Sequence, residues 1–163
     1  MARMKSQLNV LNALANAQNS NMLSNVTEIE VTFAGATGNA IGNDGGTLDP
    51  YTLFSVTGTV VMDVIGVCDT LVASAGGGTI EVGTAINTAG IIALTTASAI
   101  GVAGEIWHDA TPDSSIEGIA IITPKVVTQD VILTTKTADV TAGVIKFYCM
   151  WSPLSQDGNV TSG

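Results

Sequence analysis

Alternation of apolar and polar side chains runs along most of this chain and predicts β-strands. In residues 26–33 (VTEIEVTF), every second side chain is apolar from Ile29 to Phe33. A period of two places neighbouring side chains on opposite faces of a sheet, so this segment is expected to have one apolar and one wet face. The longest signal of this kind covers residues 53–68, where Gly58 and Gly66 are expected to mark bulges or bends.

Shorter apolar runs between turn signals predict further strands. In the strong segment 143–151, Phe147 and Trp151 share one face and are expected to be core or interface anchors, while Tyr148 faces the other way. The remaining predicted strands are 79–84, 91–95, 104–107, 119–123, 126–127 and 131–135. Many short strands with frequent turns predict an all-β fold, an antiparallel β-sandwich or barrel of the jelly-roll kind.

The two ends of the chain differ from its middle. Residues 4–18 carry Val10, Leu11 and Leu14 at helical spacing, which predicts a short helix that flanking asparagines weaken. This stripe could pack on its own domain or on a neighbour, and we take Val10, Leu11 and Leu14, with Trp151, as interface candidates. The predicted organisation is an N-terminal helical arm over 1–25, a β-sandwich domain over 26–155 and a flexible polar tail over 156–163.

The distribution of charged residues indicates which kinds of partner the chain can bind. No Lys or Arg lies between Lys5 and Lys125, and the net charge is −9. Such a surface argues against nucleic acid and anionic membranes as partners. Only 12% of residues are charged and 46% are hydrophobic, whereas an ordinary domain has about 25% charged residues. Because charge depletion marks interface cores, we expect a homo-oligomer or a subunit of a larger assembly.

Targeting signals are not evident in the sequence. Residues 8–14 (LNVLNAL) are broken by Asn and form no signal-peptide core, and no apolar run approaches the ~18 residues of a membrane span. We therefore expect synthesis in a cytoplasm without export. Cys68 and Cys149 lie in apolar runs and form no metal pattern, so buried free thiols are expected, with a single disulfide left open.

Candidate chemistry is sparse, and we expect no enzyme, no cofactor and no metal. The sole histidine, His108, lies beside Asp109 and near Ser114, which invites comparison with a hydrolase triad. The sequence lacks a Gly-x-Ser-x-Gly elbow and offers no obvious second metal ligand. His108 is therefore expected to be an ordinary loop residue.

Other candidate sites have simpler structural interpretations. Gly76–Gly78 resembles a phosphate loop but precedes a predicted strand and lacks a Lys, so a hairpin turn is expected. Asp44-Gly45 with Asp49 does not fit an EF-hand and is expected to be a turn. Asp63 could be an interior or interface acid, but a wet strand face is favoured for it. The aromatic residues Trp107, Tyr148 and Trp151 could stack on sugar rings, but a core or interface role is favoured.

Two parts of the sequence resemble a known class of protein. Residues 140–155 (VTAGVIKFYCMWSPLS), followed by 157–160 (DGNV), are similar to the C-terminal stretch of small virion proteins of tailed bacteriophages. Residues 58–68 (GTVVMDVIGVC) and 79–84 (TIEVGT) resemble their middle part, so that the likeness covers roughly residues 53–155. It identifies no binding residues.

This resemblance implies a role in the phage particle. The expected function is capsid decoration or cementing, in which the chain bridges shell subunits on the outside of the head. The implied partners are the major capsid protein and further copies of the chain, with a trimer expected, and the implied location is the virion. The alternatives are another virion component, such as a tail tube, head fibre base or host-binding appendage, and a carbohydrate-binding β-sandwich.

Overall fold

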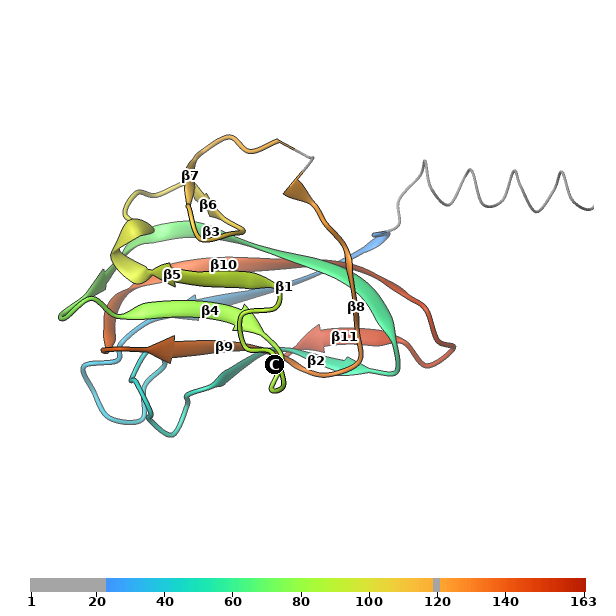
Figure 1. Cartoon of the computed structure of the whole chain (residues 1–163), viewed down its shortest axis with the longest axis horizontal. Coiled ribbons are helices and arrows are strands. Elements are labelled where there is room, and N and C mark those ends of the chain that lie inside the picture. The colour runs from blue at the N-terminus through green and yellow to red at the C-terminus, as the bar shows by residue number, and fades with distance from the viewer. Residues whose placement is uncertain (1–22, 119–120) are drawn as a thin grey trace, which may run out of the picture.

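Two antiparallel sheets packed face to face form a β-sandwich (Figure 1). The computed structural model describes residues 23–118 and 121–163. The predicted all-β sandwich is therefore confirmed, and its two sheets remain separate layers rather than a barrel. The predicted helix over 4–18, with Val10, Leu11 and Leu14, lies outside the described residues.

The first sheet, called sheet A, has six strands. Its path is β1 (Asn25–Thr32), β10 (Val140–Pro153), β3 (Val60–Ser74), β6 (Glu105–Trp107) and β7 (Asp113–Ser114), and β8 (Lys125–Val127) also pairs with β3. On β10, Phe147 and Trp151 are buried, and Lys146, Tyr148 and Met150 at the alternate positions are half-buried. The alternation predicted for this strand is therefore confirmed.

The second sheet, called sheet B, has five strands. Its order is β11 (Asn159–Ser162), β2 (Tyr51–Thr57), β9 (Val131–Lys136), β4 (Thr79–Gly83) and β5 (Ile92–Thr96), and the short 3-10 helix η1 (Ala97–Ala99) follows β5. The prediction of a flexible tail over 156–163 is wrong, because Asn159–Ser162 pairs with β2. Val160 is buried against the core and holds this edge strand in place.

The long strand predicted over 53–68 is two strands in different sheets. The chain leaves β2 of sheet B at Gly58, whose φ of +64° suits glycine, and enters β3 of sheet A at Val60. A Cβ on Gly58 would lie 2.5 Å from the Ser155 Oγ atom, so a side chain there would also collide. Gly58 is thus a crossing between sheets and not a bulge.

Two further strand connections differ from the predictions. Gly76–Gly78 does form a turn, but it joins β3 of sheet A to β4 of sheet B and so is no hairpin. The strand predicted over 119–123 is absent from residues 121–123, and the next strand, β8, begins at Lys125. Apolar content alone suggested a strand there.

Two tryptophans lie in the core between the sheets. Trp107 is fully buried, its ring packs edge-on against Phe147 at 5.9 Å, and its Nε1 donates to the Thr95 Oγ1 atom of the opposite sheet at 2.8 Å. Trp151 is 9% exposed and its Nε1 donates to Thr27 Oγ1 at 3.0 Å. Buried Trp needs such a partner for its N–H. The chain thus uses Trp151 in its own core, and an additional interface role stays a prediction.

Both cysteines are buried in the same core. Cys68 and Cys149 are free thiols, as the apolar runs around them predicted. The disulfide alternative is therefore excluded for this fold.

Candidate functional site

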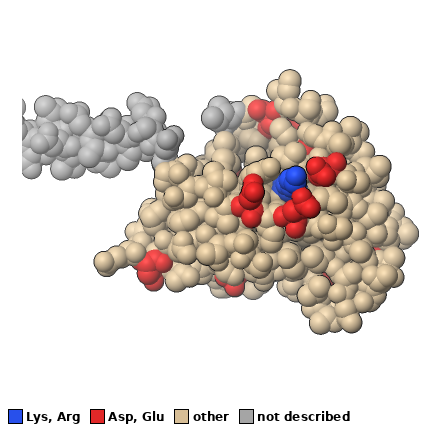
Figure 2. Space-filling model, turned by 180° about the vertical axis from the view of Figure 1, so that it is seen from behind, with Lys and Arg blue, Asp and Glu red and all other residues tan. Residues whose placement is uncertain are grey.

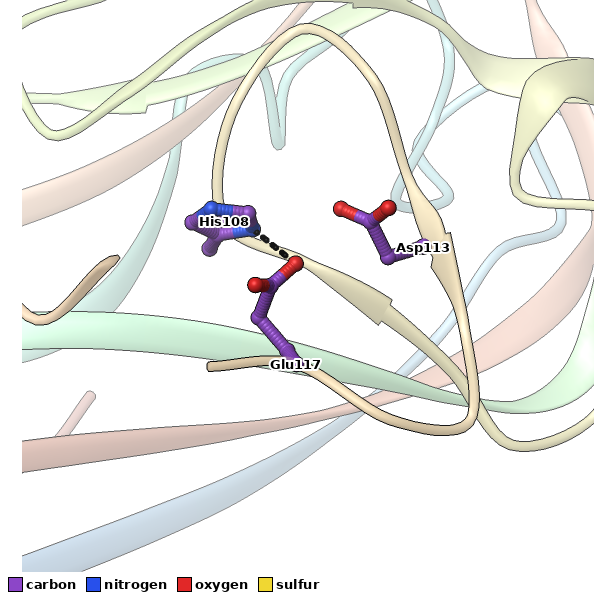
Figure 3. A group of neighbouring side chains, drawn as sticks. All are labelled: His108, Asp113 and Glu117. Carbon is purple, nitrogen blue, oxygen red and sulfur yellow. Dashed lines mark ion pairs between the residues drawn. The ribbon is translucent and has the colours of Figure 1, made fainter. Parts of the chain in front are cut away.

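A short hairpin at the edge of sheet A brings together one imidazole and two carboxylates. Strand β6 ends at Trp107, whose buried ring fixes the strand end, so His108 follows at a defined place. Strand β7 folds back on β6 and pairs Asp113 with Ile106. The chain then turns through Ser115, with a φ of +60°, and delivers Glu117. Figure 3 shows the side chains of His108, Asp113 and Glu117 converging from these segments.

The three side chains are close enough to act as one group. One ligand atom from each of His108, Asp113 and Glu117 lies within 4.8 Å of the others. The Nδ1 atom of His108 is 3.9 Å from Glu117 Oε2, and its Nε2 atom is 3.6 Å from Asp109 Oδ2. The His108 side chain is only 11% exposed, and Nδ1 is buried with no hydrogen-bond partner among the described residues.

The two carboxyl groups of this cluster respond to each other. The pKa of Asp113 is raised, chiefly because its side chain hydrogen-bonds to Glu117. The pKa of Glu117 is lowered, first by that same bond and then by the backbone N–H of Gly118, which donates to Oε1 at 2.6 Å. A proton that binds to this pair therefore goes to Asp113 before Glu117. This arrangement can accommodate either a proton or a cation.

The sequence prediction for His108 was wrong on its surroundings. We expected no second metal ligand near it, yet the hairpin brings up Asp113 and Glu117. Within residues 23–118 and 121–163, Ser114 makes no hydrogen bond to His108, so the geometry is not that of a hydrolase triad. A signal was present in the sequence. Asp109 follows His108 directly, and Asp113 and Glu117 come four and eight residues after Asp109 in the same polar segment.

A hollow of about 380 Å³ lies on the Asp109 side of the histidine. His108, Asp109, Asp63 and Lys125 supply its polar lining. Asp63 is buried, contrary to the wet face predicted for it, because the segment leading into β8 covers it. Its Oδ2 accepts from the backbone N–H of Thr123 at 3.0 Å, and Lys125 Nζ lies 3.6 Å from Oδ1.

Every lysine that the structure describes faces a carboxylate of the same chain. Lys125 faces Asp63, and Lys136 Nζ is 2.6 Å from the buried Glu81 Oε1. Lys146 lies 3.5 Å from a Glu30 oxygen and 3.9 Å from an oxygen of Asp69. Figure 2 shows one face of the molecule on which a small basic group is surrounded by acidic side chains. In the described part of the chain, no lysine is left over to hold a phosphate or a substrate carboxylate.

The face of sheet A that points away from sheet B, called the outer face, carries both apolar and charged side chains. Strand register places side chains of β1, β10, β3 and β6 side by side on it. Its apolar members are Val26, Ile65, Val67, Ile106, Val144, Tyr148 and Met150. Val26 is 64% exposed and the others are half-buried. Glu28 lies opposite Tyr148 and Glu30 opposite Lys146, so a charged group interrupts the apolar residues on this face.

The other candidate sites have structural roles. Asp49 accepts backbone N–H groups of Gly45 at 3.0 Å and Thr135 at 2.8 Å, so this carboxylate holds a turn and anchors it to β9. Trp107 and Trp151 are both buried and present no platform for a sugar ring.

No helix among the described residues is long and apolar enough to cross a membrane. Neither a protein-family model, nor a curated protein, nor a solved structure matches this chain.

Proposed function

We propose that the chain is a structural subunit of a tailed bacteriophage particle and that it binds the outside of the head as a decoration or cement protein. The sequence resemblance over residues 53–155 supports a virion role. The observation that carries the proposal in the structure is the outer face of sheet A. On this account the protein is not an enzyme. Its function is to stabilise the shell by burying surface area in contacts with neighbouring shell subunits.

An antiparallel sheet with apolar side chains on both faces needs a second covering layer. In sheet A, the inner side chains such as Phe147 pack against sheet B, while Tyr148 and Met150 on the outer face are only half-buried. A monomeric sandwich ordinarily alternates apolar-in with polar-out. The apolar outer face is therefore the surface on which a partner gains most by binding.

Charge indicates what that partner offers. The outer face itself carries Glu28 and Glu30, and Lys146 on the same face is already opposed by Glu30 and Asp69. Complementary contact therefore needs an apolar patch with Lys or Arg at its rim. We propose that the major capsid protein supplies this patch, with further copies of the chain completing a trimer around it.

The carbohydrate-binding alternative receives no support from the aromatic residues. Sugar recognition by stacking needs an exposed ring, yet both tryptophans are buried and Phe147 is fully buried. Tyr148 lies half-buried on the outer face, with Ile65 opposite it on β3 and Glu28 opposite it on β1. A different virion position, such as the tail tube, would use the same outer face, and particle imaging separates it from the head.

The docking surface can be tested with two matched substitutions. Val26→Glu places a charge on the outer face at a side chain that is 64% exposed, and Ile86→Glu does the same at 84% exposure outside sheet A. Both positions are open enough for folding to survive. Recombinant parent and variant chains would be mixed with heads assembled without this protein, and the bound fraction measured after sedimentation.

The expected result is that parent and Ile86→Glu bind equally and that Val26→Glu binds at least 10-fold more weakly. Circular dichroism of both variants controls for folding. Failure of the parent to bind heads would contradict the decoration role. Equal binding of Val26→Glu would contradict the outer face as the docking surface.

A further inference from the structure

We propose that His108, Asp113 and Glu117 form a binding site for a divalent transition-metal ion of the Zn²⁺ type, with Asp109 as a positioning residue. The site joins the β6–β7 hairpin to the segment that follows it. This inference is independent of the virion role, because it rests on the hairpin and not on the outer face of sheet A.

The orientation of the imidazole is the first argument. The Nε2 atom of His108 lies 3.6 Å from the Asp109 carboxylate. With its proton on Nε2, the ring would present the Nδ1 lone pair to the cluster, and Nδ1 is buried with no hydrogen-bond partner among the described residues. A carboxylate that orients the far nitrogen of a histidine is the usual outer partner of a metal-ligating imidazole.

Mutual repulsion is the second argument. The Nδ1 lone pair points toward Glu117 Oε2 at 3.9 Å, and the Asp113 carboxyl lies within the same 4.8 Å group. Three acceptors thus face one another in a place where the imidazole is nearly nine-tenths buried. Buried acceptors need a donor or a cation. One metal ion would satisfy all three side chains at once.

The spacing is the third argument. Zn²⁺ binds imidazole nitrogen at about 2.0–2.1 Å and carboxylate oxygen at about 2.0–2.2 Å, so in tetrahedral geometry two ligand atoms lie about 3.4 Å apart. The Nδ1 to Oε2 distance of 3.9 Å exceeds this spacing by about 0.5 Å, and the 4.8 Å span of the group exceeds it by about 1.4 Å. Binding would therefore draw the Asp113 and Glu117 side chains inward by rotation about their side-chain bonds.

The donor set selects the class of ion. One imidazole with two carboxylates suits Zn²⁺ and its transition-metal neighbours, whereas Ca²⁺ and Mg²⁺ prefer ligand sets made entirely of oxygen. Three protein ligands leave a fourth position for water or for a group from a partner. The bound ion would fasten Glu117 to the hairpin and so fix the neighbouring Ile116, which is highly exposed.

The test is titration of the full, tag-free, metal-free chain with ZnCl₂ at neutral pH by isothermal calorimetry. The parent is expected to bind one Zn²⁺ per chain, and an excess of Mg²⁺ should not displace it. Asp113→Asn and Glu117→Gln should each weaken binding at least 10-fold, and Asp109→Asn should weaken it by a smaller factor. Glu28→Gln, which removes the same charge from an exposed outer-face position, should leave binding unchanged.

The imidazole gives a second readout, because His108 is the only histidine in the chain. Its ring resonances in the NMR spectrum should shift or broaden with one equivalent of Zn²⁺ in the parent and in Glu28→Gln, but not in Glu117→Gln. Thermal melts of the metal-free variants check that each one folds. Absence of one-to-one binding would overturn the site. Binding that all variants retain, with unmoved His108 resonances, would also overturn it and indicate diffuse attraction to the acidic surface.

Discussion

Trp107 and Phe147 meet edge-on in the hydrophobic core of the sandwich. Both rings are fully buried, and the indole N–H reaches across to Thr95 of the opposite sheet. One residue further along β10, Tyr148 faces outward. Neighbouring positions of one strand are therefore expected to differ sharply in their contribution to the free energy of unfolding.

Replacing Phe147 with Ala should reduce the free energy of unfolding by about 3–5 kcal/mol, because the change leaves a cavity beside Trp107. Tyr148→Ala is the matched control, since it removes a ring of similar size from the half-buried outer face. Chemical denaturation of both variants gives the comparison. Equal losses at the two positions would show that the register of β10 is wrong.

Cys149 provides a pH-dependent prediction. Burial, helped by the charge of Asp63, raises the pKa of its thiol from 9.0 to about 12. Below pH 9 the thiol is protonated in both the folded and the unfolded chain, so its contribution to stability is fully present. Between pH 9 and 12 the unfolded chain ionises first, and stability should fall. The advantage of the parent over Cys149→Ala, measured by denaturation, should therefore narrow as pH rises from 8.5 to 10.5.

The same burial should protect the thiol from alkylation. Iodoacetamide at pH 8 should leave Cys149 unmodified in the folded chain and modify it in guanidinium chloride, as followed by mass spectrometry. Rapid labelling of the folded chain would contradict the buried position of Cys149 in β10.

The residues of the candidate metal site could not be grouped from the sequence alone. His108 was visible as the only histidine, but Asp113 and Glu117 approach it through β6 and β7, which have three and two residues. Strands so short leave almost no periodic signal. The interval of four between Asp109, Asp113 and Glu117 is visible in the sequence. It indicates that Asp113 and Glu117 lie close to His108 only once the chain is known to form the β6–β7 hairpin.

At the scale of elements, period-two alternation predicted the strands that have a full apolar face. β1 and β10 lie where the pattern placed them, with Ile29 packed against the core and Phe147 within it. The pattern could not show which sheet each strand joins. The sequence therefore marked Gly58 only as a bulge or a bend, and the structure shows that the chain crosses from sheet B to sheet A there.

β11 was missed for a related reason. Only Val160 is buried in this four-residue strand, so the sequence shows one apolar position among polar neighbours. Its stability comes from backbone pairing with β2 and not from a periodic pattern. Whether a short edge strand forms depends on its tertiary contacts, and local sequence propensity does not include these contacts.

This edge strand gives a prediction at the element scale. Val160→Ala removes two buried carbon atoms at about 0.8 kcal/mol each, so the free energy of unfolding should fall by about 1.5 kcal/mol. Thr161→Ala, at the next and exposed position, should change it by less than about 0.5 kcal/mol. Equal and negligible effects in thermal or chemical denaturation would show that residues 159–162 are a loose tail after all.

At the scale of the whole molecule, charge and apolar surface are distributed as an assembling subunit needs them. The net charge is −9, and each described lysine already faces a carboxylate. The outer face of sheet A, by contrast, gathers apolar side chains from four strands. Under the proposed role, negative charge would keep the free chain in solution and the apolar side chains of the outer face would favour association.

We therefore expect the purified chain to form a stable oligomer. Three copies of the 16.5 kDa chain should sediment together at about 50 kDa at micromolar concentration. Val26→Glu tests in the same experiment whether the oligomer itself uses the outer face. A clean monomer across the micromolar range would contradict the assembly prediction.

The position of the chain on the particle tests the proposed function most directly. An antibody raised against the recombinant protein, with gold label, would be applied to tailed particles purified from cells that carry the encoding genome, and the label located by electron microscopy. We predict label spread over the outside of the head at many regularly spaced positions. Label confined to the tail, or particles that lack the protein altogether, would contradict a head-decoration role.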